Sequence, residues 1–239
     1  MAHINFEHVT IRYPIYNAKS LSLRNQLVRL GTGGRVLKDS GVVTVTALDD
    51  VSFEIKEGDA VGLIGHNGAG KTTLLRTMAG IYEPEQGRID REGRVSTIIE
   101  LGAGMDTELT GYENIFRMGI LLGATRAEMD HAIPDIETFT ELGDFLSMPV
   151  RTYSSGMIMR LMFAVGTAMQ PEILLIDEMF STGDAGFQEK AQRRMLKFID
   201  SAKVFIFSSH SQDLVKKYCR RMFVLDHGRV TEHSDFGNG

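Results

Sequence analysis

The distribution of polar and apolar residues over the first quarter of the chain predicts strands. Apolar residues alternate with polar ones over residues 4–11, a pattern typical of an edge strand, and the pattern ends at Tyr13 and Pro14. A second strand is expected over residues 42–55, and the short apolar run 60–64 is typical of a buried parallel strand. The N-terminal region is therefore expected to be mainly β-structure.

The rest of the chain alternates between helical and strand patterns. A helix is predicted over residues 71–79 and closed by Gly80. Two helix-start signatures, each a threonine followed three residues later by a glutamate, lie at Thr110 and Thr125, and Pro134 complicates the prediction of the second helix. Further elements are predicted in this order: a helix from Met157, a strand over 173–176, a helix over 187–199, a strand over 204–207, a helix from Gln212 and a hairpin at 226–228.

Strands that alternate with helices predict an α/β fold with a parallel sheet. We expect a single domain over residues 1–239, with its core formed by about residues 1–109 and 171–239. The mainly helical stretch from about 110 to 170 is expected to be a subdomain inserted into that sheet.

A basic insertion is predicted between the first two strands, at about residues 14–41. Its charged residues are almost all positive, and Leu23, Leu27 and Leu30 follow a helical spacing. Two interpretations remain open: a solvated surface whose leucines cap the core, or a surface that docks a partner near an anionic membrane.

The composition is that of a folded globular protein. The 239 residues include 26 Lys and Arg and 31 Asp and Glu, a net charge of −5, which does not indicate a surface for nucleic acid. The single cysteine, Cys219, cannot form an internal disulfide and suits a reducing compartment. No apolar stretch approaches the roughly 20 residues of a membrane-spanning helix, and the first residues lack the apolar core of a signal peptide.

A phosphate-binding loop is predicted over residues 65–72, between an apolar strand and a helix. Its glycines let backbone N–H groups face phosphates, Lys71 reaches the β- and γ-phosphates, and the Thr72 hydroxyl can ligate Mg²⁺. A glycine-rich turn without a ligand is the alternative. The expected nucleotide contacts from this segment are Gly65, His66, Asn67, Gly68, Ala69, Gly70, Lys71, Thr72 and Thr73.

Polar side chains also follow two of the later strands. Asp177 and Glu178 end the strand 173–176; Asp177 is expected to hold Mg²⁺ through water, and Glu178 to take a proton from the attacking water. His210, which follows the strand 204–207, is a candidate sensor of the γ-phosphate. The alternative for Asp177 and Glu178 is that one or both carboxylates cap a turn, and the alternative for His210 is a structural role. The remaining histidines show no spacing like a zinc site, and His66 is expected only to line its loop.

A second anion site is predicted at residues 153–157, directly before a helix. Ser154 or Ser155 would cap that helix, and its exposed N–H groups would face an anion. The apolar stripe from Ile158 to Met169 is expected to be core. A simple helix cap is the alternative, but a chain with one complete phosphate loop makes a second phosphate contact plausible on another copy of the chain.

Together these motifs resemble the nucleotide-binding subunit of an ATP-binding cassette (ABC) transporter, in the right order and over nearly the whole chain. Residues 65–72 are similar to the family's Walker A motif, 173–178 to its Walker B motif and 153–157 to its signature. The resemblance implies a P-loop NTPase fold, an ABC-type ATPase core with an inserted helical subdomain and N-terminal antiparallel strands. It also implies ATP and Mg²⁺ as cofactors.

The resemblance assigns further residues. Asp184 lies where the family has its D-loop aspartate, His210 matches the switch histidine, and Tyr13 is the candidate that stacks on adenine. Ser154, Ser155 and Gly156 would contact the nucleotide held by a partner subunit.

Three departures from the family pattern stand out. Tyr153, Ser155 and Met157 replace residues of the usual Leu-Ser-Gly-Gly-Gln signature, and the D-loop region lacks the common proline and leucine. Glu100 replaces a glutamine that contacts Mg²⁺ in most relatives, so its own Mg²⁺ contact is direct, water-bridged or absent.

These departures resemble the branch that exports bacterial surface polysaccharides, in particular lipopolysaccharide O-antigen. The resemblance implies a homodimer with two ATP molecules sandwiched between its subunits, on the cytoplasmic face of the inner membrane. Two copies of a permease would receive the motion through the loop 100–111 and the helical subdomain. The short segment after the last hairpin leaves no room for a carbohydrate-binding domain, so the permease is expected to contact the cargo. The alternatives are export of capsular polysaccharide or teichoic acid, a soluble ABC ATPase and a small-molecule kinase.

Overall fold

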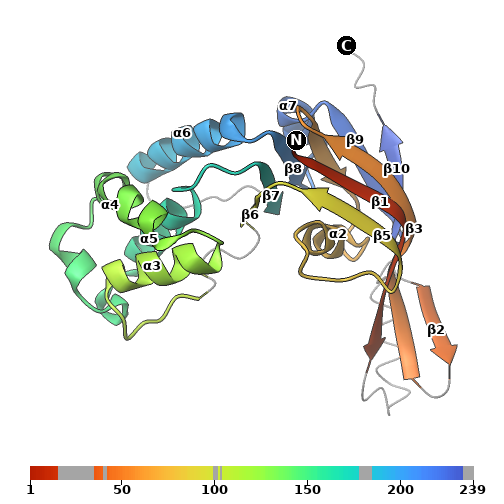
Figure 1. Cartoon of the computed structure of the whole chain (residues 1–239), viewed down its shortest axis with the longest axis horizontal. Coiled ribbons are helices and arrows are strands. Elements are labelled where there is room, and N and C mark those ends of the chain that lie inside the picture. The colour runs from red at the N-terminus through yellow and green to blue at the C-terminus, as the bar shows by residue number, and fades with distance from the viewer. Residues whose placement is uncertain (16–34, 40–41, 99–101, 103, 178–184, 234–239) are drawn as a thin grey trace. The chain divides into compact units, whose positions relative to one another are not determined.

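The computed structural model describes residues 1–15, 35–39, 42–98, 102, 104–177 and 185–233, and the chain divides into two compact units (Figure 1). The first unit consists of residues 1–95, 175–178 and 203–239, and the second of residues 96–174 and 179–202. Glu100, Glu178 and Asp184 lie outside the described residues, as do Lys19, Arg24, Arg29 and the three leucines of the basic insertion.

A four-stranded antiparallel sheet lies in the first unit, with the strand order β2-β3-β1-β5. Its strands are β1 (His3–Ile15), β2 (Arg35–Asp39), β3 (Val42–Lys56) and β5 (Gln86–Glu92). The prediction that β1 is an edge strand is wrong, because β1 pairs with both β3 and β5. An alternating polar and apolar pattern indicates that one face of a strand is buried. A central strand shows the same pattern when one face of its sheet is exposed to solvent.

A bulge in β1 explains its hydrophobic pattern. Phe6 and Val9 are both buried although they are three positions apart, and the register with β3 shifts between them. His8, at this shift, has a φ of 51°, so one extra residue lets both side chains reach the same face. Beyond the bulge, β1, β3 and β2 continue as a ribbon that projects away from the rest of the sheet (Figure 1). Strand β2 was not predicted.

A six-stranded sheet has the order β10-β9-β4-β8-β7-β6. Its strands are β4 (Ala60–Ile64), β6 (Val95–Ile98), β7 (Ile173–Asp177), β8 (Val204–Ser208), β9 (Arg221–Asp226) and β10 (Arg229–His233). Strand β4 pairs in parallel with both β8 and β9, whereas β9 and β10 form the predicted antiparallel hairpin. The predicted α/β architecture is confirmed. Helices α2 (Lys71–Met78) and α7 (Gln212–Tyr218) belong to the first unit.

The second unit is mainly helical. Its elements are α3 (Gly111–Leu121), α4 (Arg126–Thr140), the 3-10 helices η1 (Gly143–Ser147) and η2 (Val150–Thr152), α5 (Ser155–Gly166) and α6 (Ala185–Ser201). Both predicted helix starts are confirmed as capping boxes, with Thr110 paired to Glu113 and Thr125 to Glu128. Helix α4 continues through Pro134. Among the described residues, none of the helices combines the length and apolarity needed to cross a bilayer.

The predicted core stripe of α5 is only partly right. Leu161 and Val165 are buried, but Ile158 and Met162 are only half-buried. Phe163, outside the stripe, is buried as well and stacks on Phe139 of α4 at a centroid distance of 5.7 Å. Because α5 packs against both α3 and α4, its buried surface is wider than the single face that helical spacing predicts.

Candidate functional site

The phosphate loop connects the end of β4 to the start of α2. Gly68 and Gly70 have φ values of 81° and 111°, a region that favours glycine, and Gly70 is the N-cap residue of α2. A Cβ atom on Gly65 would lie 2.5 Å from the Leu225 carbonyl oxygen, and one on Gly70 would lie 2.7 Å from that of Ala47. The loop therefore requires glycine both for its backbone path and for its close approach to neighbouring strands.

Lys71 directs its charge into this loop. Its side chain is buried, with the residue 8% exposed, and Nζ donates hydrogen bonds to the carbonyl oxygens of Gly65 at 2.6 Å and His66 at 3.2 Å. A buried ammonium group in the concave side of a glycine-rich loop is suited to bind an anion. The arrangement therefore fits a phosphate ligand.

Thr72 joins the phosphate loop to the end of β7. Its hydroxyl donates a hydrogen bond of 2.9 Å to Oδ2 of Asp177, which is half-buried. A hydroxyl and a carboxylate oxygen are hard donors of the kind that Mg²⁺ prefers. The two predicted metal ligands therefore lie together and fit that ion.

His210 leaves the sheet at the same edge as the phosphate loop. Strands β4 and β8 are parallel, with Leu63 opposite Ser208, and the backbone N–H of Ser209 donates to the Leu63 carbonyl at 3.1 Å. Gly65 and His210 therefore follow the same ends of neighbouring strands. The His210 side chain is exposed, as a group that contacts a ligand must be.

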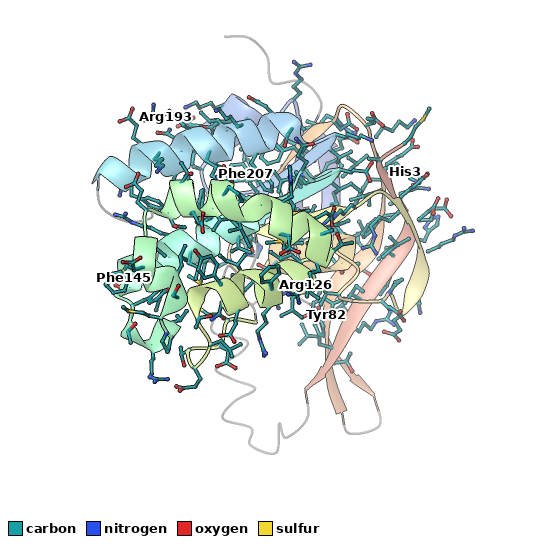
Figure 2. All side chains as sticks on the ribbon, turned by 60° about the vertical axis from the view of Figure 1, so that its left-hand side comes forward. His3, Tyr82, Arg126, Phe145, Arg193 and Phe207 are labelled. Atoms are coloured by element: carbon teal, nitrogen blue, oxygen red, sulfur yellow. The ribbon has the colours of Figure 1, made fainter. Side chains whose placement is uncertain are left out.

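Tyr13 lines a hollow of about 480 Å³ beside α2. Its ring meets that of Tyr82 edge to face at a centroid distance of 5.6 Å, and Arg76 donates a hydrogen bond of 3.2 Å to the Tyr82 hydroxyl. Burial raises the pKa of Tyr13, and the neighbouring Thr73 hydroxyl lowers it in part. Figure 2 shows Tyr82 on the side of the projecting ribbon, and His3 at the opposite end of β1. Sequence reasoning missed Tyr82 and Arg76, which carry no motif of their own.

The predicted signature segment begins α5 in the second unit. Ser154 is the N-cap residue, and its Oγ accepts a hydrogen bond of 3.3 Å from the Met157 N–H. Ser154 and Ser155 are exposed, and among the described residues a Cβ atom on Gly156 would have only Ser154 Oγ within 4 Å, at 3.9 Å. Packing against the described residues therefore does not require glycine at position 156.

Tyr153 explains one departure from the family signature. Its hydroxyl donates a hydrogen bond of 2.6 Å to the carbonyl oxygen of Phe145 in η1, and the residue is buried. A leucine at this position would make no such bond. Tyr153 therefore anchors the segment that precedes Ser154.

Three further side chains meet beside the phosphate loop. Nε2 of His66 lies 3.3 Å from Oδ1 of Asp226, and Nδ1 of His227 lies 2.6 Å from the same oxygen. Sequence spacing gave no sign of this cluster, because His66 is separated from the other two residues by most of the chain.

The chain belongs to the ABC transporter family: the family described as ABC transporter matches residues 48–181. It is 64% identical over 235 residues to the O-antigen export system ATP-binding protein RfbE of Yersinia enterocolitica, covering 98% of both chains. It is 39% identical over 229 residues to RfbB of Klebsiella pneumoniae, which bears the same description, covering 96% of this chain and 92% of that protein.

Solved structures share the fold. The structure of an ATP-binding subunit of an ABC transporter matches with a TM-score of 0.67 and 23% identity, over 97% of this chain and 89% of the other. A dimeric ATP-binding cassette bound to ADP and Pi matches with a TM-score of 0.67 and 20% identity, over 98% of this chain and 99% of the other. The predicted family and the predicted P-loop NTPase fold class are confirmed.

Proposed function

We propose that this protein is the ATP-hydrolysing subunit of a system that exports lipopolysaccharide O-antigen. The observation that carries the proposal is the site at the end of β4 and β7, where Lys71 lies within the phosphate loop and Thr72 bonds to Asp177 at 2.9 Å. We assign O-antigen as the cargo because a relative with 64% identity is described as an O-antigen export protein. A teichoic acid export protein of Bacillus anthracis is 38% identical, and the match spans only 40% of its length. Teichoic acid is therefore less well supported as the cargo than O-antigen.

Each site residue has its own role in ATP hydrolysis. Thr72 and Asp177 would hold Mg²⁺, with Glu100 a further candidate, and the ion would neutralise charge on the β- and γ-phosphates. Lys71 and the loop N–H groups bind the phosphates. Glu178 accepts a proton from the attacking water, and His210 contacts the γ-phosphate.

The working unit is a head-to-tail homodimer that sandwiches two ATP molecules. Each phosphate loop faces the partner's copies of the signature residues Ser154, Ser155 and Gly156, and Asp184 lies in the same interface. The exposed serines and the open space at Gly156 support this arrangement, because a surface free of its own chain can receive a phosphate. ATP favours the closed pair through contacts from both subunits, and hydrolysis removes them.

The cargo crosses the membrane through a separate permease, present in two copies, which makes most of the contacts with the polysaccharide. The protein binds that permease from the cytoplasmic face of the inner membrane. It acts as one nucleotide-binding domain over residues 1–239, with the helical subdomain at about 110–170 and the loop 100–111 facing the permease. Tyr13 stacks on adenine in the hollow beside α2.

Complementation tests the proposal. A strain that lacks its own O-antigen export ATPase is given this chain with its permease, and surface O-antigen is read from lipopolysaccharide gels. We expect the wild type to restore the long-chain pattern and Lys71→Ala to abolish it. Lys190→Ala is the matched control, because Lys190 bonds to Glu141 and to the Thr138 carbonyl within the helical unit. Restoration by Lys71→Ala, or none by the wild type, contradicts the proposal.

A further inference from the structure

Two histidines and one carboxylate converge beside the phosphate loop. One ligand atom from each of His66, Asp226 and His227 lies within 4.8 Å of the other two, and all three side chains are exposed. His66 belongs to the phosphate loop, whereas Asp226 and His227 belong to the hairpin between β9 and β10 (Figure 1). Within the described residues, it is the only group of three histidine, cysteine or acidic side chains with this spacing.

The hydrogen bonds of His66 leave a nitrogen available. Its Nδ1 lies 2.9 Å from the Asn67 carbonyl oxygen, which can only accept, so Nδ1 carries the proton. Nε2 faces Oδ1 of the Asp226 carboxylate at 3.3 Å. A proton on Nε2 bridges these two atoms in the imidazolium form, and in the neutral form the lone pair of Nε2 can bind a metal cation in place of that proton. A histidine that donates its other N–H to a backbone carbonyl is also the usual arrangement of a metal ligand.

The spacing of the ligand atoms suits a tetrahedral ion. Bonds of about 2.0–2.1 Å to nitrogen and oxygen at tetrahedral angles place neighbouring ligand atoms roughly 3.3 Å apart. The His66 to Asp226 separation of 3.3 Å already has this value. Nδ1 of His227, at 2.6 Å from Asp226, needs to move outward, and its exposed ring is free to turn.

The turn is joined to the loop by backbone contacts. The Gly228 N–H donates to the Ala69 carbonyl at 3.1 Å, and the Asp49 N–H donates to the Gly228 carbonyl at 2.9 Å. The two ligand-bearing segments are therefore positioned by the fold and do not depend on the side chains alone to stay close.

We propose that His66, Asp226 and His227 bind a divalent transition cation of the Zn²⁺ class, and that this ion ties the β9–β10 turn to the phosphate loop. Imidazole nitrogens with one carboxylate favour such an ion over Mg²⁺, which prefers oxygen ligands. Solvent or a bound nucleotide completes the coordination. Since Lys71 bonds to the His66 carbonyl, the ion restrains the part of the loop that carries the lysine.

Two other groups in the described residues, Cys219 and the pair of His8 with Asp50, compete poorly for the ion. Cys219 is buried, and burial raises the pKa of its thiol to about 12, so it is not a thiolate at neutral pH. His8 contacts Asp50 at 2.8 Å, but that pair contains a single histidine.

His8 provides a closely matched control. His8 and His227 both have left-handed backbone conformations, with φ values of 51° and 48°, and both contact an aspartate through Nδ1. Asparagine adopts that conformation readily, so His8→Asn and His227→Asn should both fold. His227→Asn also creates an Asn-Gly turn, which is favoured in two-residue hairpins.

The experiment is calorimetric titration of the untagged, nucleotide-free chain with Zn²⁺ alone. We expect one ion per chain with a micromolar dissociation constant, at least tenfold weaker binding by His227→Asn, and unchanged binding by His8→Asn. Absence of binding by the wild type contradicts the site. So does equal binding by wild type and His227→Asn, or an equal loss in both variants.

Thermal unfolding gives a second, independent measurement. A hundredfold excess of Zn²⁺ over its dissociation constant should raise the melting temperature of the wild type by about 5 °C or more, and that of His227→Asn by much less. A chelator should return the wild type to its starting value. In the presence of chelator, His227→Asn should bind ATP as the wild type does, so failure of the metal site is distinguishable from failure of the nucleotide site.

Discussion

The hydroxyl of Thr72 donates a hydrogen bond of 2.9 Å to the carboxylate of Asp177, although 105 positions separate the two residues. The contact joins the first turn of α2 to the end of β7. It brings a hydroxyl ligand and an acidic ligand to one place beside the buried ammonium group of Lys71. The site therefore has the oxygen donors for a divalent ion next to the positive charge for a phosphate.

Thr72→Val should separate metal binding from nucleotide binding. Valine keeps the shape of threonine but removes the hydroxyl, so the Mg²⁺-dependent rate should fall by roughly 10- to 100-fold, the size of a lost hydrogen bond to a charged group. Thr72→Ser, which keeps the hydroxyl, should retain most of the rate. ATPase assays over a Mg²⁺ titration measure both, and equal rates in the valine and serine variants would argue against Thr72 as a ligand.

Gly156→Ala should damage activity without damaging the fold. In the described part of the chain, a Cβ atom at this position meets only Ser154 Oγ, at 3.9 Å, and alanine favours the first turn of α5 by about 1 kcal/mol. We expect an unchanged or higher melting temperature together with loss of ATP-dependent dimerisation, because the added methyl group would meet the partner's phosphate. A variant with a normal dimer and normal hydrolysis would show that Gly156 lies outside the interface.

Tyr13 should act through its ring and not through its hydroxyl. The Tyr13 hydroxyl oxygen is buried, and within the described part of the chain it forms no hydrogen bond of normal length and angle, although the Thr73 hydroxyl lies near it, so Tyr13→Phe should keep both stability and ATP affinity. Tyr13→Ala should weaken ATP binding about tenfold or more, the usual worth of a base stacked on an aromatic ring. Fluorescence titration with ATP measures the difference, and equal affinity of the phenylalanine and alanine variants would remove Tyr13 from the adenine site.

Thr110→Ala should destabilise the helical unit. The Thr110 hydroxyl accepts from the Glu113 N–H at 3.2 Å and donates to its carboxylate at 2.7 Å. Loss of an N-cap of this kind lowers the free energy of unfolding by about 1 kcal/mol. Urea unfolding of Thr110→Ala and of Thr110→Ser measures this free energy, because serine preserves the cap and alanine removes it. If both variants lost the same free energy of unfolding, the cap would not account for the loss.

Local spacing was sufficient for some features. The capping boxes at Thr110 and Thr125 were predictable because both partners lie within one turn of helix. The phosphate loop was predictable because its residues, 65–72, are consecutive in the chain. Strand β5 was not, because nearly all of its residues are exposed and its polar sequence carries no alternation. It forms because β1 provides a partner, as β3 does for β2.

Tertiary contacts account for what the sequence could not predict at the site. Tyr82 and Arg76 belong to no sequence motif, and only the fold brings Tyr82 against Tyr13 and Arg76 against Tyr82. His66 and His227 lie 161 positions apart, so no ligand spacing could reveal their contact with Asp226. Thr72 and Asp177 were both predicted because each belongs to a motif that is recognisable alone.

The central claim is that ATP is held jointly by two copies of this chain. Light scattering during size-exclusion chromatography of Glu178→Gln, saturated with Mg²⁺ and ATP, tests it most directly. The account predicts a stable dimer that disappears when ATP is withheld or when Gly156→Ala is added. A monomer in saturating Mg²⁺ and ATP, also in the presence of the permease, would contradict it.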